Sequence, residues 1–282
     1  MVLEALTNPL RAEARPWTTF FWGFIYATAA VFLSLWIFAQ YASLVMVFLA
    51  SLAAIPLFYN TTRIEEEKDL QLDSETARLN EHRKAFEFLM FLFIGMVAAF
   101  TLWYLVLPAS TVQSLFNVQS ATITGLQQHV IANVARGGLF SKIFLNNMKV
   151  LVFCILFSFI YGMGALFILT WNASVIAVAA GNFIRAQLAS VAGTLGLGTI
   201  SSYFYIVSLS FVRYFIHGIP EILAYFIGGL AGGIISIAIV KHDFGTKKFE
   251  KIVLDAADLT LLAIGLLIIA AIIEVYITPV LF

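Results

Sequence analysis

The sequence predicts an all-α integral membrane protein, a bundle of about seven transmembrane helices with broken or re-entrant helices in the region 172–221. Composition is the first reason. Of the 282 residues, 61% are hydrophobic and 11% are charged, whereas soluble domains have roughly 45 to 50% and about 25%. The other two reasons are repeated apolar runs of crossing length and a few charge-rich connections between them.

The apolar runs follow one another along the chain, and a helix needs about 20 apolar residues to cross the hydrocarbon core. Runs that reach or approach this length lie at 17–39, 42–59, 86–107, 149–170, 199–217, 219–240 and 258–279. The first run is longer than the roughly 7 to 15 apolar residues of a cleavable signal peptide. We therefore expect it to be retained as a membrane anchor.

Lysine and arginine in the connections predict the orientation of the chain. Loop 60–85 and segment 241–257 are rich in these residues, whereas 108–148 contains only Arg136 and Lys142. By the positive-inside rule, the first two are cytoplasmic and 108–148 is an external loop. We expect a multi-pass protein of the cell membrane, with its N-terminus in the cytoplasm and its C-terminus outside.

Segment 172–198 is the ambiguous part of the topology, because it is semi-polar and rich in glycine. Two loops on the same side are separated by an even number of crossings, which limits the choices. We expect 172–198 to form a re-entrant or interfacial helix, surrounded by protein or water. In the alternative, 172–192 crosses and 199–217 only dips into the membrane. Both arrangements give the same parity.

Ionisable residues inside an apolar stretch are the main candidates for a functional site. Arg213 and His217 are four residues apart and would share one helix face. Gly218 and Pro220 then predict a helix break, and Glu221 would lie in the first turn of the next helix, where the dipole favours negative charge. Many transporters build their sites from broken helices of this kind.

A second acidic residue, Glu274, lies in the outer half of the last run. Residues 88–220 contain no acidic residue, so the basic groups have few alternative counter-ions. We predict that the charged groups converge, because hydrocarbon solvates none of them. The predicted intramembrane polar cluster consists of Arg213, His217, Glu221 and Glu274. Three readings stay open: a structural network, a transport or ligand site, and charges that reach the outer headgroups.

Small and amide residues mark further positions. Asn146 and Asn147 precede the fourth run, and capping of its helix is preferred over a binding role. Glycines permit close helix approach within one chain or between two chains; these are Gly162, Gly164, Gly228, Gly229, Gly232 and Gly233. The remaining motif residues are Asn182, Arg185, Thr278 and Pro279.

Several classes of protein find no support in the sequence. It contains no nucleotide-binding glycine loop, zincin motif or serine nucleophile elbow. Cys154 is the single cysteine and the net charge is zero, so we expect no metal site, cofactor or nucleic-acid partner. An enzyme is not expected. The alternative is an intramembrane hydrolase or lipid transferase that uses His217 and Glu221 as an acid–base pair.

The second half of the chain, from about residue 140, resembles the stage II sporulation protein M family of polytopic membrane proteins. The matching pieces are Phe144-Leu145-Asn146-Asn147, His217-Gly218-Ile219-Pro220-Glu221, the paired glycines from Gly228 to Gly233, and Ile273-Glu274-Val275-Tyr276-Ile277-Thr278-Pro279. The resemblance implies a scaffold or localising subunit, because the namesake works with cell-wall-degrading partners in a membrane complex. It transfers no catalytic residue, and relatives occur in organisms that make no spores.

These observations predict a division of the chain and two functions. Residues 1–107 would form a transmembrane hairpin, the charged loop and the third crossing, 108–148 the external loop, and 149–282 the family-like core. The first function is a non-enzymatic scaffold or assembly subunit that contacts the lipid bilayer, a second copy of itself, or protein partners through loops 60–85 and 108–148. The alternative is a channel or transporter with a polar pathway around His217 and Glu221.

Overall fold

The computed structural model describes residues 15–69, 75–131, 136–161, 165–191, 197–240 and 245–281, and within these ranges the chain is helical with no strand. The helices are α3 (Thr18–Ile37), the 3₁₀ turn η1 (Ala39–Tyr41), α4 (Ala42–Asp69), α5 (Glu75–Val106), α6 (Ala109–Leu115), α7 (Asn117–Ile131), α8 (Arg136–Tyr161), α9 (Ala165–Val191), α10 (Leu197–Val240), α11 (Lys247–Ile272), the π-helix η2 (Ile273–Ile277) and α12 (Thr278–Leu281). Seven of them are long and apolar enough to cross a membrane. The predicted fold class is confirmed.

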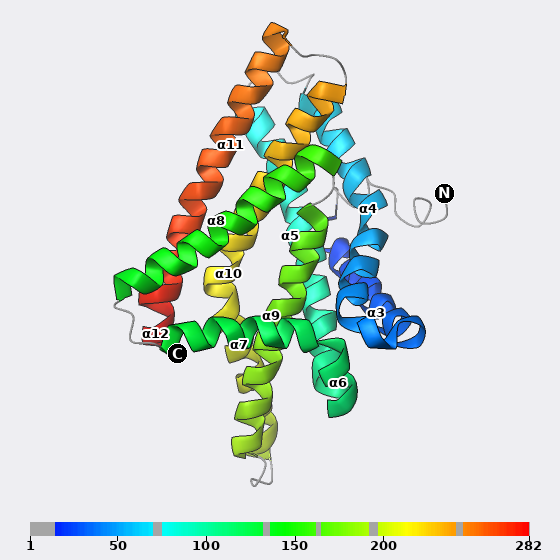
Figure 1. Cartoon of the computed structure of the whole chain (residues 1–282), viewed down its shortest axis with the longest axis vertical. Coiled ribbons are helices and arrows are strands. Elements are labelled where there is room, and N and C mark those ends of the chain that lie inside the picture. Colours follow the sequence, from blue (N-terminus) through cyan, green and yellow to red (C-terminus); the bar gives the residue numbers. More distant parts are fainter. Residues whose placement is uncertain are drawn as a thin grey trace.

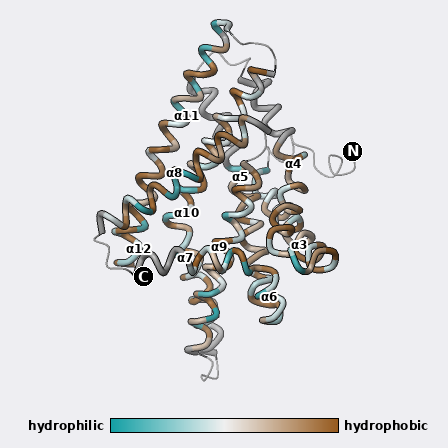
Figure 2. Tube along the Cα trace, viewed as in Figure 1, coloured by the Kyte–Doolittle hydropathy of each residue, from teal (hydrophilic) through white to brown (hydrophobic). Residues whose placement is uncertain are grey.

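The long helices run up and down, and α7 lies across them (Figure 1). The end of α4, the start of α5, the end of α10 and the start of α11 lie at one end of the bundle, while α6 and α7 lie toward the other end (Figure 1). The end of α9 and the start of α10 form a hairpin that extends beyond α7 (Figure 1). Figure 2 shows mostly hydrophobic long helices, with hydrophilic positions in the first turns of α11 and in this hairpin.

The helix break predicted at Gly218 and Pro220 is wrong. Runs 199–217 and 219–240 form the single helix α10 of 44 residues, with Pro220 inside it. Proline removes one backbone hydrogen bond, but transmembrane helices tolerate it when neighbouring helices enclose the backbone. Gly218 is buried in the helix without a positive φ. Glu221 therefore lies in a helix interior and not at a new N-terminus.

The crossing predicted at 149–170 and the re-entrant segment at 172–198 are also wrong. Helix α8 ends at Tyr161, and α9 is a separate span that contains residues 172–191. Two polar side chains near its start are satisfied within the helix: the Asn172 amide donates to the carbonyl of Ile168 at 2.8 Å, and Ser174 donates to that of Trp171 at 2.7 Å. The crossing of 172–192 considered as the alternative is the one observed, while 199–217 is part of a full span.

Glycines bring two helix pairs into backbone contact. In the N-terminal part, a Cβ at Gly23 would lie 2.0 Å from the carbonyl oxygen of Leu92, and one at Gly95 would lie 2.0 Å from that of Phe20. Helices α3 and α5 therefore cross with only glycine between their backbones. The residue pair is not one that the sequence analysis selected.

The paired glycines of α10 pack in the same manner against α8. A Cβ at Gly232 would lie 2.3 Å from the carbonyl oxygen of Ile155, and one at Gly228 would lie 2.4 Å from Leu151. Gly229 and Gly233 are also buried. These residues serve close approach within one chain and form no exposed face for a second copy. Gly162 and Gly164 lie outside the described residues.

Candidate functional site

The structure brings the two intramembrane carboxylates together between α10 and the end of α11. The hydroxyl of Tyr225 donates to Oε1 of Glu221 at 2.7 Å, and Tyr225 is fully enclosed by protein. Glu274 is near enough to Glu221 and Tyr225 to interact with both electrostatically. The side chains of Glu221 and Glu274 are half-buried. Two carboxylates and a phenol thus share one site.

A π-helical turn places Glu274 at this site. Residues Ile273–Ile277 form the π-helix η2, which packs against both α10 and α8. The hydroxyl of Thr278 donates to the carbonyl of Ile273, five residues earlier, at 3.1 Å. The same carbonyl also accepts from the backbone N–H of Thr278, so the Thr278 hydroxyl gives it a second hydrogen bond in the widened turn. Pro279 follows in α12. Single π turns inside α-helices occur frequently at functional sites.

The acid–base pairing expected from the sequence is absent. Neither Glu221 nor Glu274 has a basic side chain among the groups that act on it within the described part of the chain. Arg213 instead lies over the ring of Phe183, with 5.1 Å between its guanidinium carbon and the ring centre. The cluster is therefore divided into an acidic group at α11 and a basic group at α9. Arg213 and His217 remain close, because they share a face of α10.

Arg185 and Asn182 belong to a second polar group, formed with α5. Arg185 donates to the carbonyl of Tyr104 at 2.5 Å and lies over its ring, 4.7 Å from the centre. The hydroxyl of Tyr104 donates in turn to Oδ1 of Asn182 at 2.5 Å. A backbone carbonyl and an aromatic face thus stabilise the charge of Arg185, in the role that a carboxylate would usually have.

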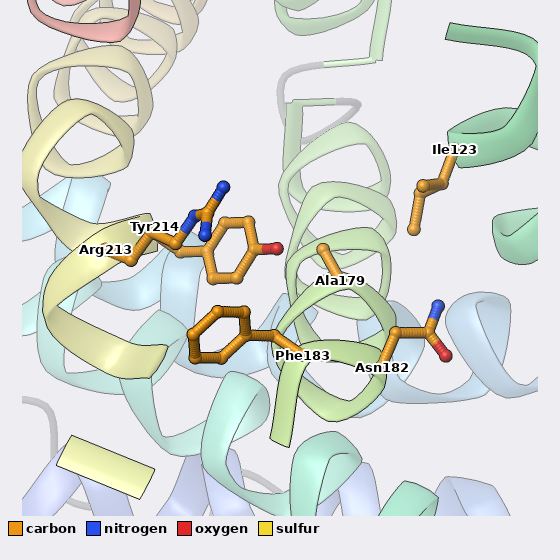
Figure 3. A pocket seen from close by; sticks show the side chains of 6 residues that line it. All are labelled: Ile123, Ala179, Asn182, Phe183, Arg213 and Tyr214. Carbon is orange, nitrogen blue, oxygen red and sulfur yellow. The ribbon is translucent and has the colours of Figure 1, made fainter. Parts of the chain in front are cut away.

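A pocket of about 250 Å³ lies between α7, α9 and α10. Figure 3 shows Arg213 and Tyr214 extending from α10, with Phe183 and Ala179 on α9 and Ile123 on α7 across the gap. Asn182 completes the lining. The pocket therefore combines a cation, a hydroxyl and an amide with apolar walls, and contains no carboxylate.

The remaining predicted residues take structural positions. Asn146 and Asn147 lie well inside α8, so the prediction that they cap its first turn is wrong; Asn147 is buried and Asn146 is exposed. The Nδ1 atom of His217 is buried without a hydrogen-bond partner among the described residues. Within the same residues, no group of three His, Cys, Asp or Glu side chains could hold a metal ion.

The family model described as stage II sporulation protein M matches residues 85–279. The chain belongs to the stage II sporulation protein M family. This confirms the resemblance, and the match begins earlier than the resemblance at about residue 140, so that it includes the apolar part of α5. Comparisons with curated proteins and with solved structures found no match.

Three residues of the family region were missed by the sequence analysis. Tyr225 lies four residues after Glu221, so helical spacing could have found it. Tyr104 is 78 residues from Asn182, and only the fold brings the two together. Gln119 is fully buried, where its amide accepts from the Ser43 hydroxyl at 2.6 Å and donates to that of Ser174 at 3.1 Å. No local pattern marks Gln119 as the residue that joins α4, α7 and α9.

Proposed function

We propose that this member of the stage II sporulation protein M family is a non-enzymatic assembly subunit of a membrane complex. The observation that carries the proposal is the hairpin of α9 and α10, which extends beyond α7 (Figure 1). At its α10 side it exposes three consecutive aromatic residues, Tyr203, Phe204 and Tyr205, with 42%, 77% and 64% of their surfaces accessible. Aromatic residues are enriched in protein interfaces.

The length of α10 supports an extramembrane position for these rings. Its 44 residues span about 66 Å at roughly 1.5 Å per residue. A bilayer with headgroups is roughly 40 to 45 Å thick, so one end of α10 extends into water. Helix α7 lies across the bundle, as expected of a helix that follows the membrane surface. The hairpin beyond α7 would then meet a partner rather than acyl chains.

The interior of the bundle suits a rigid support. Hydrogen bonds from Gln119 and Tyr104 tie α7 and α5 to α9, and glycines lock α3 to α5 and α8 to α10. The lysines and arginines of loops 60–85 and 241–257 support an orientation with these loops in the cytoplasm. The hairpin would then face the outside, together with α6 and α7.

A photo-crosslinking amino acid at position 204 tests the proposal in native membranes. We expect a defined protein adduct at this position. The matched control is position 153 on α8, where Phe153 is also exposed, at 53%, but does not belong to the hairpin. Crosslinking of position 204 to lipid alone, as at position 153, would contradict an assembly role for the hairpin.

A second candidate, transport of a proton or cation, is favoured by the carboxylate pair. Glu221 and Glu274 have no basic partner among the described residues, and like charges at close range favour uptake of a positive charge. The continuous α10 removes the half-helix argument for this candidate. In proteoliposomes, transport predicts an ion flux that Glu221→Gln abolishes and Tyr276→Phe, at an exposed residue of η2, leaves unchanged. Absence of flux for the wild type would exclude this candidate.

A further inference from the structure

We propose that the pocket between α7, α9 and α10 binds a phosphate-bearing anion through Arg213. The pocket has about 250 Å³ of space and is lined by Arg213, Tyr214, Asn182, Phe183, Ala179 and Ile123. This inference is independent of the assembly role, because the pocket is separate from the exposed rings of the hairpin. The class of ligand follows from charge, from hydrogen-bonding groups and from position.

Charge is the first argument. Arg213 has no carboxylate partner within the described residues, and it stacks on Phe183. Residues 88–220 contain no acidic residue at all. Helices α7 and α9 and the part of α10 before Glu221 therefore have no carboxylate that could pair with Arg213. A partly buried arginine without a counter-ion is costly. An anion supplied from outside the chain would remove this cost.

Comparison with Arg185 is the second argument. Arg185 also stacks on a ring, but its guanidinium additionally donates to the carbonyl of Tyr104. Arg213 has the stacking contact alone among the described residues. The contact with the ring uses none of the guanidinium N–H groups as hydrogen-bond donors to a carbonyl or carboxylate, so they stay available for a ligand. Guanidinium groups bind phosphate with two parallel hydrogen bonds.

The walls of the pocket define the rest of the ligand. Asn182 and Tyr214 add polar groups beside Arg213, while Phe183, Ala179 and Ile123 add apolar surface (Figure 3). Helix α7 contributes Ile123, and it lies across the bundle where headgroups would be expected (Figure 1). A phosphate with an apolar attachment fits this combination. Its source would be either an anionic lipid headgroup or a free phosphate compound.

The test measures binding to the purified full-length protein in detergent by native mass spectrometry. Phosphatidylglycerol and phosphatidylcholine are compared in one arm, and inorganic phosphate without added lipid is used in the other. We expect Arg213→Gln to weaken phosphate-dependent binding by about tenfold or more. Selective retention of phosphatidylglycerol identifies a lipid headgroup as the source, and Arg213-dependent binding of inorganic phosphate alone identifies a free phosphate.

Two further variants separate the pocket from general electrostatic attraction. Lys149→Gln removes the same charge from an exposed position of α8, so it should bind as the wild type does. Ala179→Leu fills the pocket while Arg213 stays in place, so it should lose binding, and it decides the outcome if Arg213→Gln misfolds. Equal binding by the wild type and the pocket variants, or equal losses in Lys149→Gln, would overturn the proposal.

Discussion

At the residue scale, Arg185 and Arg213 have the same chemistry and different surroundings. Arg185 donates to a backbone carbonyl of α5, whereas Arg213 only stacks on a ring and lines a pocket. The first arginine therefore holds two helices together. The second is available to a ligand. Residue type and membrane depth were visible in the sequence, but the partner that distinguishes the two roles was not.

Replacement of these arginines should affect stability unequally. A hydrogen bond to a charged group contributes about 1.5 to 3 kcal/mol, so Arg185→Gln should lower the free energy of unfolding by roughly that amount. Arg213→Gln is the matched control. It loses only the contact with the ring of Phe183, so it should lower the free energy of unfolding by less than about 1 kcal/mol. Thermal unfolding of the purified variants measures both. Equal losses would show that Arg213 also has a structural acceptor.

The sequence predicted which residues form the candidate site, but not which of them contact one another. Glu221 and Glu274 were expected to meet and do lie together, because both belong to segments whose surroundings offer no water. Arg213 and His217 were expected to be the partners of these carboxylates, because few other counter-ions are available. Since α10 is continuous, Arg213 stays more than two turns from Glu221 along the same helix and meets α9 instead.

At the element scale, the continuity of α10 makes a direct prediction at Gly218. This glycine lies inside the helix, and an added Cβ would meet nothing within 4 Å. Alanine is favoured over glycine in a helix interior by roughly 0.5 to 1 kcal/mol. Gly218→Ala should therefore stabilise the protein by up to that amount in thermal unfolding. A clear loss of stability would indicate that the backbone at Gly218 needs a conformation that alanine cannot adopt.

The crossing of α3 and α5 makes the opposite prediction for another helical glycine. A Cβ at Gly95 would lie 2.0 Å from the carbonyl oxygen of Phe20, and a backbone atom cannot move aside as a side chain can. Gly95→Ala should lower the free energy of unfolding by roughly 1 to 3 kcal/mol, the typical effect of overpacking. Gly265→Ala is the matched control on α11, where a Cβ would meet nothing within 4 Å. Similar unfolding temperatures for the two variants would contradict this close crossing.

At the scale of the whole molecule, the number of crossings was correct although three of the predicted runs were not. Parity agrees with this result: if loops 60–85 and 241–257 lie on the same side of the membrane, as their lysines and arginines predict, an even number of spans separates them. In the region 149–240, the structure replaces three predicted crossings and a re-entrant segment with α8, α9 and α10. Together with α5, these helices make four spans, which is an even number. Composition thus indicates how many apolar spans the chain can supply, whereas the boundaries of the helices depend on hydrogen bonds such as that of Asn172.

The arrangement of the ends can be tested with single cysteines in a Cys154→Ser background. Val118 on α7 and Phe204 in the hairpin are exposed at one end of the bundle, and Lys247 is exposed at the start of α11 at the other. We expect a membrane-impermeant maleimide to label Val118→Cys and Phe204→Cys on intact cells. The reason is that the opposite end, with the lysines and arginines of 60–85 and 241–257, should be cytoplasmic. Lys247→Cys should react only after permeabilisation. Labelling of Phe204→Cys and Lys247→Cys from the same side would mean that α10 does not cross the membrane.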